Sequence, residues 1–171
     1  MPIRALAVRS AGPEDCDRLA VVGAATFLET FAGEISGDAL LTHCRTQHSA
    51  ASYETLLAAG AKAWLAEIDG APVGYALLTE PDLDAAEPDD VELKRIYLLS
   101  RFHGKGAGSL LFKPCVSAAG KNRLLLGVKA DNRRAISFYR KNGFVQIASR
   151  QFDVGGRLYD DIVLARSPEK S

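Results

Sequence analysis

Residues 91–109 read VELKRIYLLSRFHGKGAGS, and this stretch decides more about the fold than any other. A β-rich run ends at Leu99, and Gly104, Gly106 and Gly108 follow within ten residues. The next letters, SLLFK, start like a helix. A glycine-rich loop between a strand and a helix N-terminus directs several backbone N–H groups at one point. The stretch therefore predicts an anion site, most often for phosphate.

The spacing disfavours two familiar nucleotide loops. A P-loop has Lys and then Ser or Thr directly after its second glycine, whereas here Gly106 follows Lys105. A dinucleotide loop needs its third glycine where Ser109 stands, and it belongs to the first strand–helix unit of its domain. A plain flexible turn is the structural alternative, since glycine most often serves turns.

The spacing of His103, Gly106 and Gly108 resembles another loop, the pyrophosphate loop of the GNAT superfamily of acyl-CoA-dependent N-acyltransferases. The family usually carries Gln or Arg where this chain has His103. That departure leaves the backbone cradle intact and weakens only the contribution of the side chain at this position.

A second motif follows the strand-like run Leu124–Val128. Residues 131–144, DNRRAISFYRKNGF, resemble the family signature Asn-x-x-Ala-x-x-Phe-Tyr-x-x-x-Gly-Phe. The positions in register are Asn132, Ala135, Phe138, Tyr139, Gly143 and Phe144. Two motifs in the right order, separated by one helix and one strand, identify the chain as a member of the superfamily. The resemblance covers residues 64–165 well and the first 60 residues more loosely.

Length and charge are those of one ordinary globular domain, which we expect to span 1–171. Its expected parts are acceptor-side helices at about 13–59, an acetyl-CoA-binding core at about 91–144 and a C-terminal hairpin at about 145–165. Lys and Arg, 21 in all, balance 21 Asp and Glu, so no overall basic field favours nucleic acid as a partner.

Cys16, Cys44 and Cys115 are widely spaced and form no CxxC pair. Together with only three His, they argue against a structural zinc and a disulfide framework, so we expect no metal. The start MPIRALAVRS does not read as a signal peptide, and no run approaches ~20 apolar residues. We expect a cytoplasmic protein without a membrane span.

The remaining pattern predicts an alternation of strands and helices, with a solvated acidic loop at 79–90. Expected strands are 3–9, 63–68, 72–78, 91–99, 124–128, 145–154 and 157–165, and expected helices are 13–27, one or two within 36–59, 108–119 and 132–141. Asp69-Gly70 and Gly155-Gly156 predict antiparallel hairpins, and Pro114 should bend its helix.

The expected fold class is α/β (α+β), a mixed, mostly antiparallel sheet of six to seven strands with helices on both faces. The strand–helix–strand unit 91–128 should cross over right-handed, which makes its two strands parallel. The resemblance implies that this parallel pair splays apart and that the pantetheine arm of acetyl-CoA enters the gap.

The resemblance also implies where acetyl-CoA is held. Backbone groups left without ladder partners would pair with the two pantetheine amides like an added strand. They belong to Ile96, Tyr97 and Leu98. The pyrophosphate would bind the amides of His103, Gly104, Lys105, Gly106, Ala107, Gly108 and Ser109, with Arg101 and Lys105 adding positive charge unless they are simply solvated.

Acyl transfer needs a donor to the developing oxyanion and a proton for the leaving thiolate. By resemblance, a backbone N–H at Tyr97–Leu98 polarises the carbonyl, Tyr139 is the general acid, and Asn132 bonds the pantetheine arm. Asn132 and Tyr139 lie seven residues apart and share one helical face, although Tyr139 could also be a half-buried aromatic. Cys115 has no nearby His in sequence, so we expect direct transfer without a covalent enzyme intermediate.

The base is less well defined, and Glu92 is a candidate because some family members carry a catalytic Glu on this strand. Alternation places Glu92, Lys94 and Ile96 on one face of the strand and Leu93, Arg95 and Tyr97 on the other. Glu92 could instead face solvent or pair with Lys94 or Arg95. Other members use a water chain in place of a base.

The acceptor is predicted to be the primary amine of a small molecule. TFLETF, residues 26–31, is similar to the bacterial spermine/spermidine acetyltransferase branch. Glu29 and Glu34 could bind a polyamine cation, which makes a polyamine the leading guess, although Glu29 could be an exposed helix residue. Protein or peptide N-termini, and an inactive coenzyme A-binding regulatory module, are alternatives. The terminal hairpin could join a homodimer.

Overall fold

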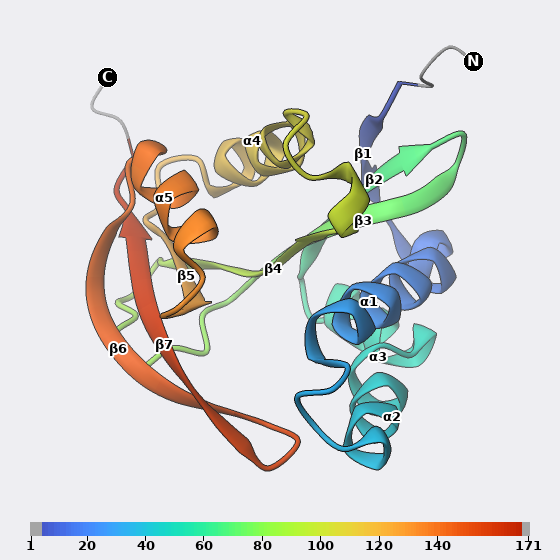
Figure 1. Cartoon of the computed structure of the whole chain (residues 1–171). Helices are drawn as coiled ribbons and strands as arrows, with labels where there is room; N and C mark the ends of the chain where they lie inside the picture. Colours follow the sequence, from blue (N-terminus) through green and yellow to red (C-terminus); the bar gives the residue numbers. More distant parts are fainter. Residues whose placement is uncertain (1–4, 169–171) are drawn as a thin grey trace.

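One mixed sheet of seven strands forms the centre of the protein, whose computed structural model describes residues 5–168 (Figure 1). Its strand order is β1-β2-β3-β4-β5-β7-β6. The strands are β1 (Ala7–Ala11), β2 (Lys62–Ile68), β3 (Ala71–Thr79), β4 (Val91–Leu98), β5 (Leu124–Lys129), β6 (Val145–Val154) and β7 (Arg157–Arg166). Among these seven strands, all within residues 5–168, only β4 and β5 pair in parallel. The predicted fold class, a mixed and mostly antiparallel sheet, is confirmed.

The helices are α1 (Cys16–Phe31), α2 (Gly37–Gln47), α3 (Ala50–Ala58), α4 (Ala107–Ala119) and α5 (Arg133–Lys141), with short 3₁₀ turns η1 (Pro13–Asp15) and η2 (Ser100–Phe102). They cover both faces of the sheet. Leu19, Val22 and Tyr53 from α1 and α3 pack on one face of β2 and β3. Leu111 and Tyr139, from α4 and α5, pack on the opposite face.

Two predicted elements at the N-terminus are shifted. The first strand covers Ala7–Ala11 rather than 3–9, and residues 3 and 4 lie outside the described residues. The first helix begins at Cys16, after the η1 turn at Pro13, and continues to Phe31 instead of ending at Phe27. Gly33, with φ +84°, turns the chain directly after it.

A β-bulge in β4 overturns the expected alternation of its side chains. Leu77 of β3 is opposite Arg95 and Leu78 is opposite Leu93, so Lys94 is an extra residue. As a result Leu93 and Ile96 lie together on the face covered by α4 and α5. The side chains of Glu92, Arg95 and Tyr97 therefore share the opposite face, on the side of α1 and α3. No sequence pattern marks the extra residue.

The parallel pair β4–β5 separates soon after it begins. Its pairing is restricted to Val91 with Leu124 and Glu92 with Leu125. Beyond that point β5 pairs only with β7, through Lys129 opposite Asp161. The splayed pair expected from the family resemblance is therefore present, and it leaves one edge of the second half of β4 open.

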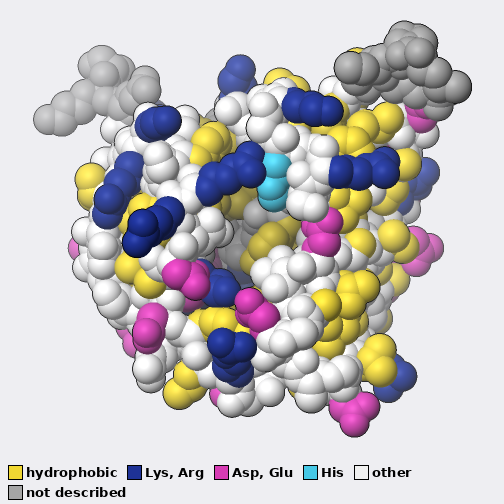
Figure 2. Space-filling view, viewed as in Figure 1, with side chains coloured by type: hydrophobic (Ala, Val, Ile, Leu, Met, Phe, Trp, Pro, Cys, Tyr) yellow, Lys and Arg dark blue, Asp and Glu magenta, His cyan; other side chains and the backbone are white. Residues whose placement is uncertain are grey.

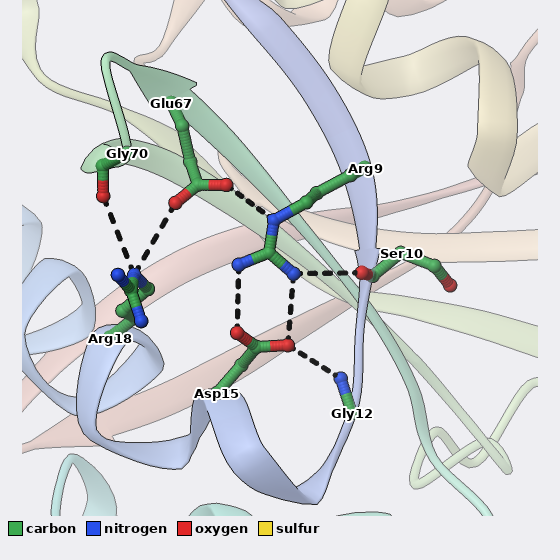
Figure 3. A network of polar contacts seen from close by, with 7 residues as sticks. All are labelled: Arg9, Ser10, Gly12, Asp15, Arg18, Glu67 and Gly70. Atoms are coloured by element: carbon green, nitrogen blue, oxygen red, sulfur yellow. Dashed lines mark hydrogen bonds and ion pairs between the residues drawn. The ribbon is translucent and has the colours of Figure 1, made fainter.

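A polar network fixes the start of α1 to the edge of the sheet (Figure 3). Arg9 of β1 lies between the carboxylates of Asp15 and Glu67, with Nη2 2.7 Å from Asp15 Oδ1. Asp15 also accepts a hydrogen bond from the Gly12 N–H at 3.0 Å, and Arg18 Nε lies 3.4 Å from Glu67 Oε2. The network therefore joins β1, β2 and α1.

Candidate active site

The face viewed in Figure 2 is hollowed near its middle, between α5, α1 and the β6–β7 hairpin. Lys and Arg side chains gather above the hollow, over α5 and the segment that leads into α4. Asp and Glu side chains, with some Lys or Arg among them, border its lower part. The two sides of the hollow therefore suit groups of different charge.

The loop before α4 has the geometry of an anion cradle. Gly104 and Gly106 have φ of +81° and +77°, values that a residue with a side chain rarely adopts. Gly106 precedes the first residue of α4, so Ala107, Gly108 and Ser109 have no carbonyl four residues earlier within the helix. Their N–H groups are therefore available to a ligand, with the positive end of the helix dipole behind them.

His103 departs from the prediction in both its backbone and its side chain. Its N–H donates to the Ser100 carbonyl at 3.0 Å, so it is not one of the cradle donors. Its ring Nε2 lies 2.7 Å from the Leu98 carbonyl oxygen and donates to it, while Nδ1 accepts from Arg134 at 3.4 Å. The ring thus connects the end of β4 to α5, which holds the loop across the mouth of the gap.

The open edge of β4 presents alternate residues to the gap. Leu99 N–H donates to the Val73 carbonyl of β3 at 2.9 Å. Because donors along an antiparallel strand alternate in direction, Ile96 and Leu98 direct their N–H and C=O groups toward the gap. Tyr97 directs its backbone toward β3, which corrects the expectation for that residue. The Leu98 carbonyl is engaged by His103, so its N–H and both groups of Ile96 remain for a ligand.

Tyr139 lies on α5 in a cage of aromatic rings. Phe112, Phe138 and Phe144 surround it, with centroids 5.4 to 6.4 Å away, and only 8% of its surface is exposed. Burial raises the pKa of its phenol well above the ordinary value. The hydroxyl therefore stays protonated through the neutral range, as a proton donor must.

Asn132 is the N-cap of α5. Its Oδ1 accepts a hydrogen bond from the Ala135 N–H at 3.2 Å, which fixes the start of the helix that carries Tyr139. The Nδ2 amide, which has two N–H donors, remains for a contact with the pantetheine arm. The positions of both Asn132 and Tyr139 are therefore set by α5.

Glu92 lies at the paired end of β4, far from the open edge. Its carboxylate is 4% exposed and accepts a hydrogen bond from the Asp82 N–H at 3.0 Å, rather than facing solvent. Tyr97 lies five positions further along the strand, about 15 Å away. The contact with Asp82 holds the 79–90 loop against the sheet.

The two carboxylates predicted for the acceptor both have partners within the chain. Glu29 accepts hydrogen bonds from the Ser100 N–H and hydroxyl, at 3.0 and 2.7 Å, and so anchors the η2 turn to α1. Ser100 lowers the pKa of Glu29 through these bonds. Glu34 accepts a hydrogen bond from the Tyr159 hydroxyl at 2.9 Å, and Lys129 Nζ lies 3.8 Å from it.

Two polar side chains on the α1 and α3 side of the sheet, Asp161 and Arg150, were not predicted. Asp161 of β7 is buried, and Arg150 of β6 lies 3.4 Å from its carboxylate. Arg150 reaches over Gly127, where a Cβ atom would lie 2.8 Å from Nη2. The signal was an alternation in β7, where Tyr159, Asp161, Val163 and Ala165 share one face, so that a carboxylate stands among apolar positions.

Other chemistries find little support among residues 5–168. Burial raises the pKa of the Cys115 thiol to about 12, and its Sγ donates to the Leu111 carbonyl inside α4. A reactive thiolate at Cys115 is therefore disfavoured. Within the described ranges, no three His, Cys, Asp or Glu side chains are grouped to hold a metal ion. No helix in this part of the chain is both long and apolar enough to span a membrane.

Comparison with known proteins gives concordant results. The model of the acetyltransferase (GNAT) family matches residues 28–144. An uncharacterized N-acetyltransferase of Mycobacterium tuberculosis is 35% identical over 156 residues, which is 89% of this chain and 97% of the relative.

Two solved structures show the same fold. The PaiA N-acetyltransferase of Thermoplasma acidophilum, in complex with coenzyme A, has a TM-score of 0.73 at 21% identity, covering 95% of this chain and 99% of the other. The ribosomal-protein-alanine N-acetyltransferase of Brucella melitensis has a TM-score of 0.72 at 23% identity, covering 94% and 99%.

Proposed function

The chain belongs to the acetyltransferase (GNAT) family, and we propose that it transfers the acetyl group of acetyl-CoA directly to a primary amine of a small molecule. The observation that carries the proposal is the gap between β4 and β5. It opens because β4 pairs with β5 only at Val91 and Glu92. The anion cradle lies at one end of this gap, and Tyr139 packs on the face of the sheet that α4 covers.

Acetyl-CoA fits the groups that border the gap. Its pyrophosphate would bind the N–H groups of the loop and of the first turn of α4, from Gly104 to Ser109. The exposed side chains of Arg101, Lys105 and Arg134 would balance its charge. The pantetheine amides would pair with Ile96 and Leu98 and with the Asn132 amide. The thioester would then end close to Tyr139.

Tyr139 would act as the general acid. When the amine attacks the carbonyl carbon, the C–N bond forms and the C–S bond breaks, and the departing thiolate takes the phenol proton. The N–H of Leu98 faces the gap and is the donor we assign to the developing oxyanion. Cys115 is buried on the inner side of α4, which supports direct transfer over an acyl-enzyme route.

The acceptor is the less constrained part of the proposal. A polyamine remains a candidate, because Glu34 is exposed and contacts Tyr159 of the β6–β7 hairpin, which borders the hollow. Its support is reduced, since both Glu29 and Glu34 are engaged by Ser100, Tyr159 and Lys129. A peptide N-terminus is the second candidate, favoured by the likeness to a protein named as acetylating ribosomal-protein alanine.

A thiol-release assay tests the activity. The purified chain is supplied with acetyl-CoA and, in turn, spermidine, free amino acids, an aminoglycoside and short peptides with free N-termini. We expect acceptor-dependent release of coenzyme A with at least one small amine. Tight binding of acetyl-CoA without turnover of any acceptor would instead support the inactive coenzyme A-binding module.

We propose two further properties. The chain works in the cytoplasm, in keeping with three cysteines that form no disulfide among the described residues. It also forms a homodimer through the β6–β7 hairpin, because β6 is an edge strand and its Val145 and Ile147 are exposed. Fractionation of cells and light scattering of the purified chain test these two proposals.

A further inference from the structure

Asp161 is a buried carboxylate on the face of the sheet that we assign to the acceptor, and it has few partners within the chain. It lies in β7 between Tyr159 and Val163 on the same face, and only 6% of it is exposed. Burying a carboxylate among apolar residues is costly unless it is paired, and its pairing to Arg150 is a single contact at 3.4 Å. The Nε of Arg150 is itself buried without a hydrogen-bond partner.

The register of the sheet places Asp161 at the level of the open end of β4. Glu92 is opposite Leu125, and Lys129, four residues further along β5, is opposite Asp161. The same distance along β4 from Glu92 would end at Ile96. Because the bulge inserts one extra residue, the position level with Lys129 is Tyr97. Asp161, one strand beyond β5, thus lies level with the segment of β4 that we assign to the thioester.

Side-chain direction places Asp161 on the acceptor side of the sheet. Val163 and Ala165, on the same face of β7, pack away from α4 and α5. The Tyr97 side chain projects to that same side, with its ring stacked 6.0 Å from Tyr75, and it is 42% exposed. Tyr139 packs on the other face. The acid and Asp161 therefore face the gap from opposite sides of the sheet.

Titratable groups from four strands lie around the Asp161 carboxylate. Burial raises its pKa most, and Asp160 of β7 adds to the increase, whereas Arg150 of β6 and Lys129 of β5 oppose it. Tyr97 of β4 is the remaining titratable group, and Asp161 in turn raises the pKa of Tyr97. Lys129 is drawn partly toward Glu34, at 3.8 Å, so Asp161 is not fully neutralised.

We propose that Asp161 binds the ammonium group of the acceptor and removes its proton, and so serves as the general base of the reaction. This inference rests on the proposed acetyl transfer. The ammonium gives one proton to the Asp161 carboxylate, and the neutral amine attacks the thioester carbon. After the C–N bond has formed, the nitrogen loses a second proton to water, and the thiolate gains the proton of Tyr139. Water then reprotonates Tyr139, and Asp161 releases its proton to solvent. Overall, an ammonium and acetyl-CoA yield an amide, coenzyme A thiol and one proton.

Asp161→Asn tests the assignment against Asp160→Asn, which removes the neighbouring exposed carboxylate on the opposite face of β7. With the fastest acceptor of the panel, we expect Asp161→Asn to lower kcat/KM at pH 7 by about 10²- to 10³-fold. The deficit should shrink toward pH 10, where the amine is neutral in solution. Asp160→Asn should keep kcat/KM at pH 7 close to that of the wild type. It should move the acid limb only slightly, toward lower pH, because Asp160 contributes weakly to the raised pKa of Asp161. Acetyl-CoA should bind both variants as it binds the wild type.

Arg150→Gln provides a second test that leaves Asp161 in place. Loss of the guanidinium raises the pKa of the carboxylate, so the acid limb of kcat/KM should move to higher pH by about one unit. An acid limb that does not move, or a deficit of Asp161→Asn that stays constant up to pH 10, would overturn the assignment. Absence of turnover by the wild type would instead overturn the proposed function and, with it, this inference.

Discussion

At the scale of single residues, the protein uses burial to set protonation states. The phenol of Tyr139 is enclosed by three Phe rings, and burial raises its pKa. Asp161 is buried on the opposite side of the sheet, and burial raises its pKa as well. The same physical cause therefore keeps the proposed acid protonated and brings the proposed base closer to the pH at which it can act.

Tyr139→Phe should remove the proton donor while preserving the aromatic cage. We expect kcat at neutral pH to fall by about 10²- to 10⁴-fold, the range for loss of a general acid. The Kd for acetyl-CoA should change little, because the ring and its packing are retained. Steady-state kinetics and calorimetric titration measure the two quantities, and an unchanged kcat would remove Tyr139 from the mechanism.

At the scale of elements, short contacts between distant segments hold the site together. His103 connects the Leu98 carbonyl to Arg134, and Ser100 connects the η2 turn to Glu29. The loop before α4 depends further on Gly104 and Gly106, both with positive φ. The cradle is thus shaped by backbone conformation as much as by side chains.

Gly106→Ala should strain the cradle without filling it. No atom lies within 4 Å of the added Cβ, but the positive φ of +77° costs a residue with a side chain about 1–2 kcal/mol. We expect the Kd for acetyl-CoA to rise roughly 5- to 30-fold. Gly37→Ala, in similarly open space but without a positive φ, is the matched control, and an equal effect of the two changes would contradict the argument.

The network around Asp15 predicts a dependence of stability on pH. Hydrogen bonds from Arg9 lower the pKa of Asp15 from 3.8 to about 2. Because the folded-state pKa is the lower one, the stabilisation is complete above about pH 4 and is lost as the pH falls to about 2. The shift corresponds to about 2 kcal/mol.

Asp15→Asn should therefore lower the free energy of unfolding by about 2 kcal/mol at pH 7 and by almost nothing at pH 2. Urea denaturation at the two pH values measures the difference. Asp17→Asn, at an exposed carboxylate of the same helix, should have little effect at either pH. Equal losses from Asp15→Asn at both pH values would mean that ionisation is not the cause.

At the scale of the whole molecule, strong local signals predicted the fold. The Asp69-Gly70 turn gave the β2–β3 hairpin, and the two motifs gave the order strand, helix, strand, helix around the gap. The features that could not be predicted from the sequence depend on one inserted residue or on contacts between distant residues. The bulge at Lys94 places Glu92 on the same face as Arg95 and Tyr97, the reverse of simple alternation. Glu29 bonds Ser100, which is distant in the sequence, and the contact of His103 with Leu98 depends on how the loop folds.

The edge of the sheet predicts how copies of the chain associate. The exposed apolar side chains of Val145 and Ile147 on β6 should lie in the dimer interface. Light scattering should give the mass of a dimer for the wild type and of a monomer for Val145→Lys. A wild type that remains monomeric at high concentration would contradict this placement.

The central claim is direct acetyl transfer from acetyl-CoA to an amine in the gap between β4 and β5. Mass spectrometry of the complete reaction with the best acceptor of the panel tests it most directly. We predict one N-acetylated amine for each coenzyme A thiol released, with no acetyl group left on the protein at any time. Acetyl-CoA consumed without an acetylated acceptor, or an acetylated protein that transfers its group onward, would contradict the claim.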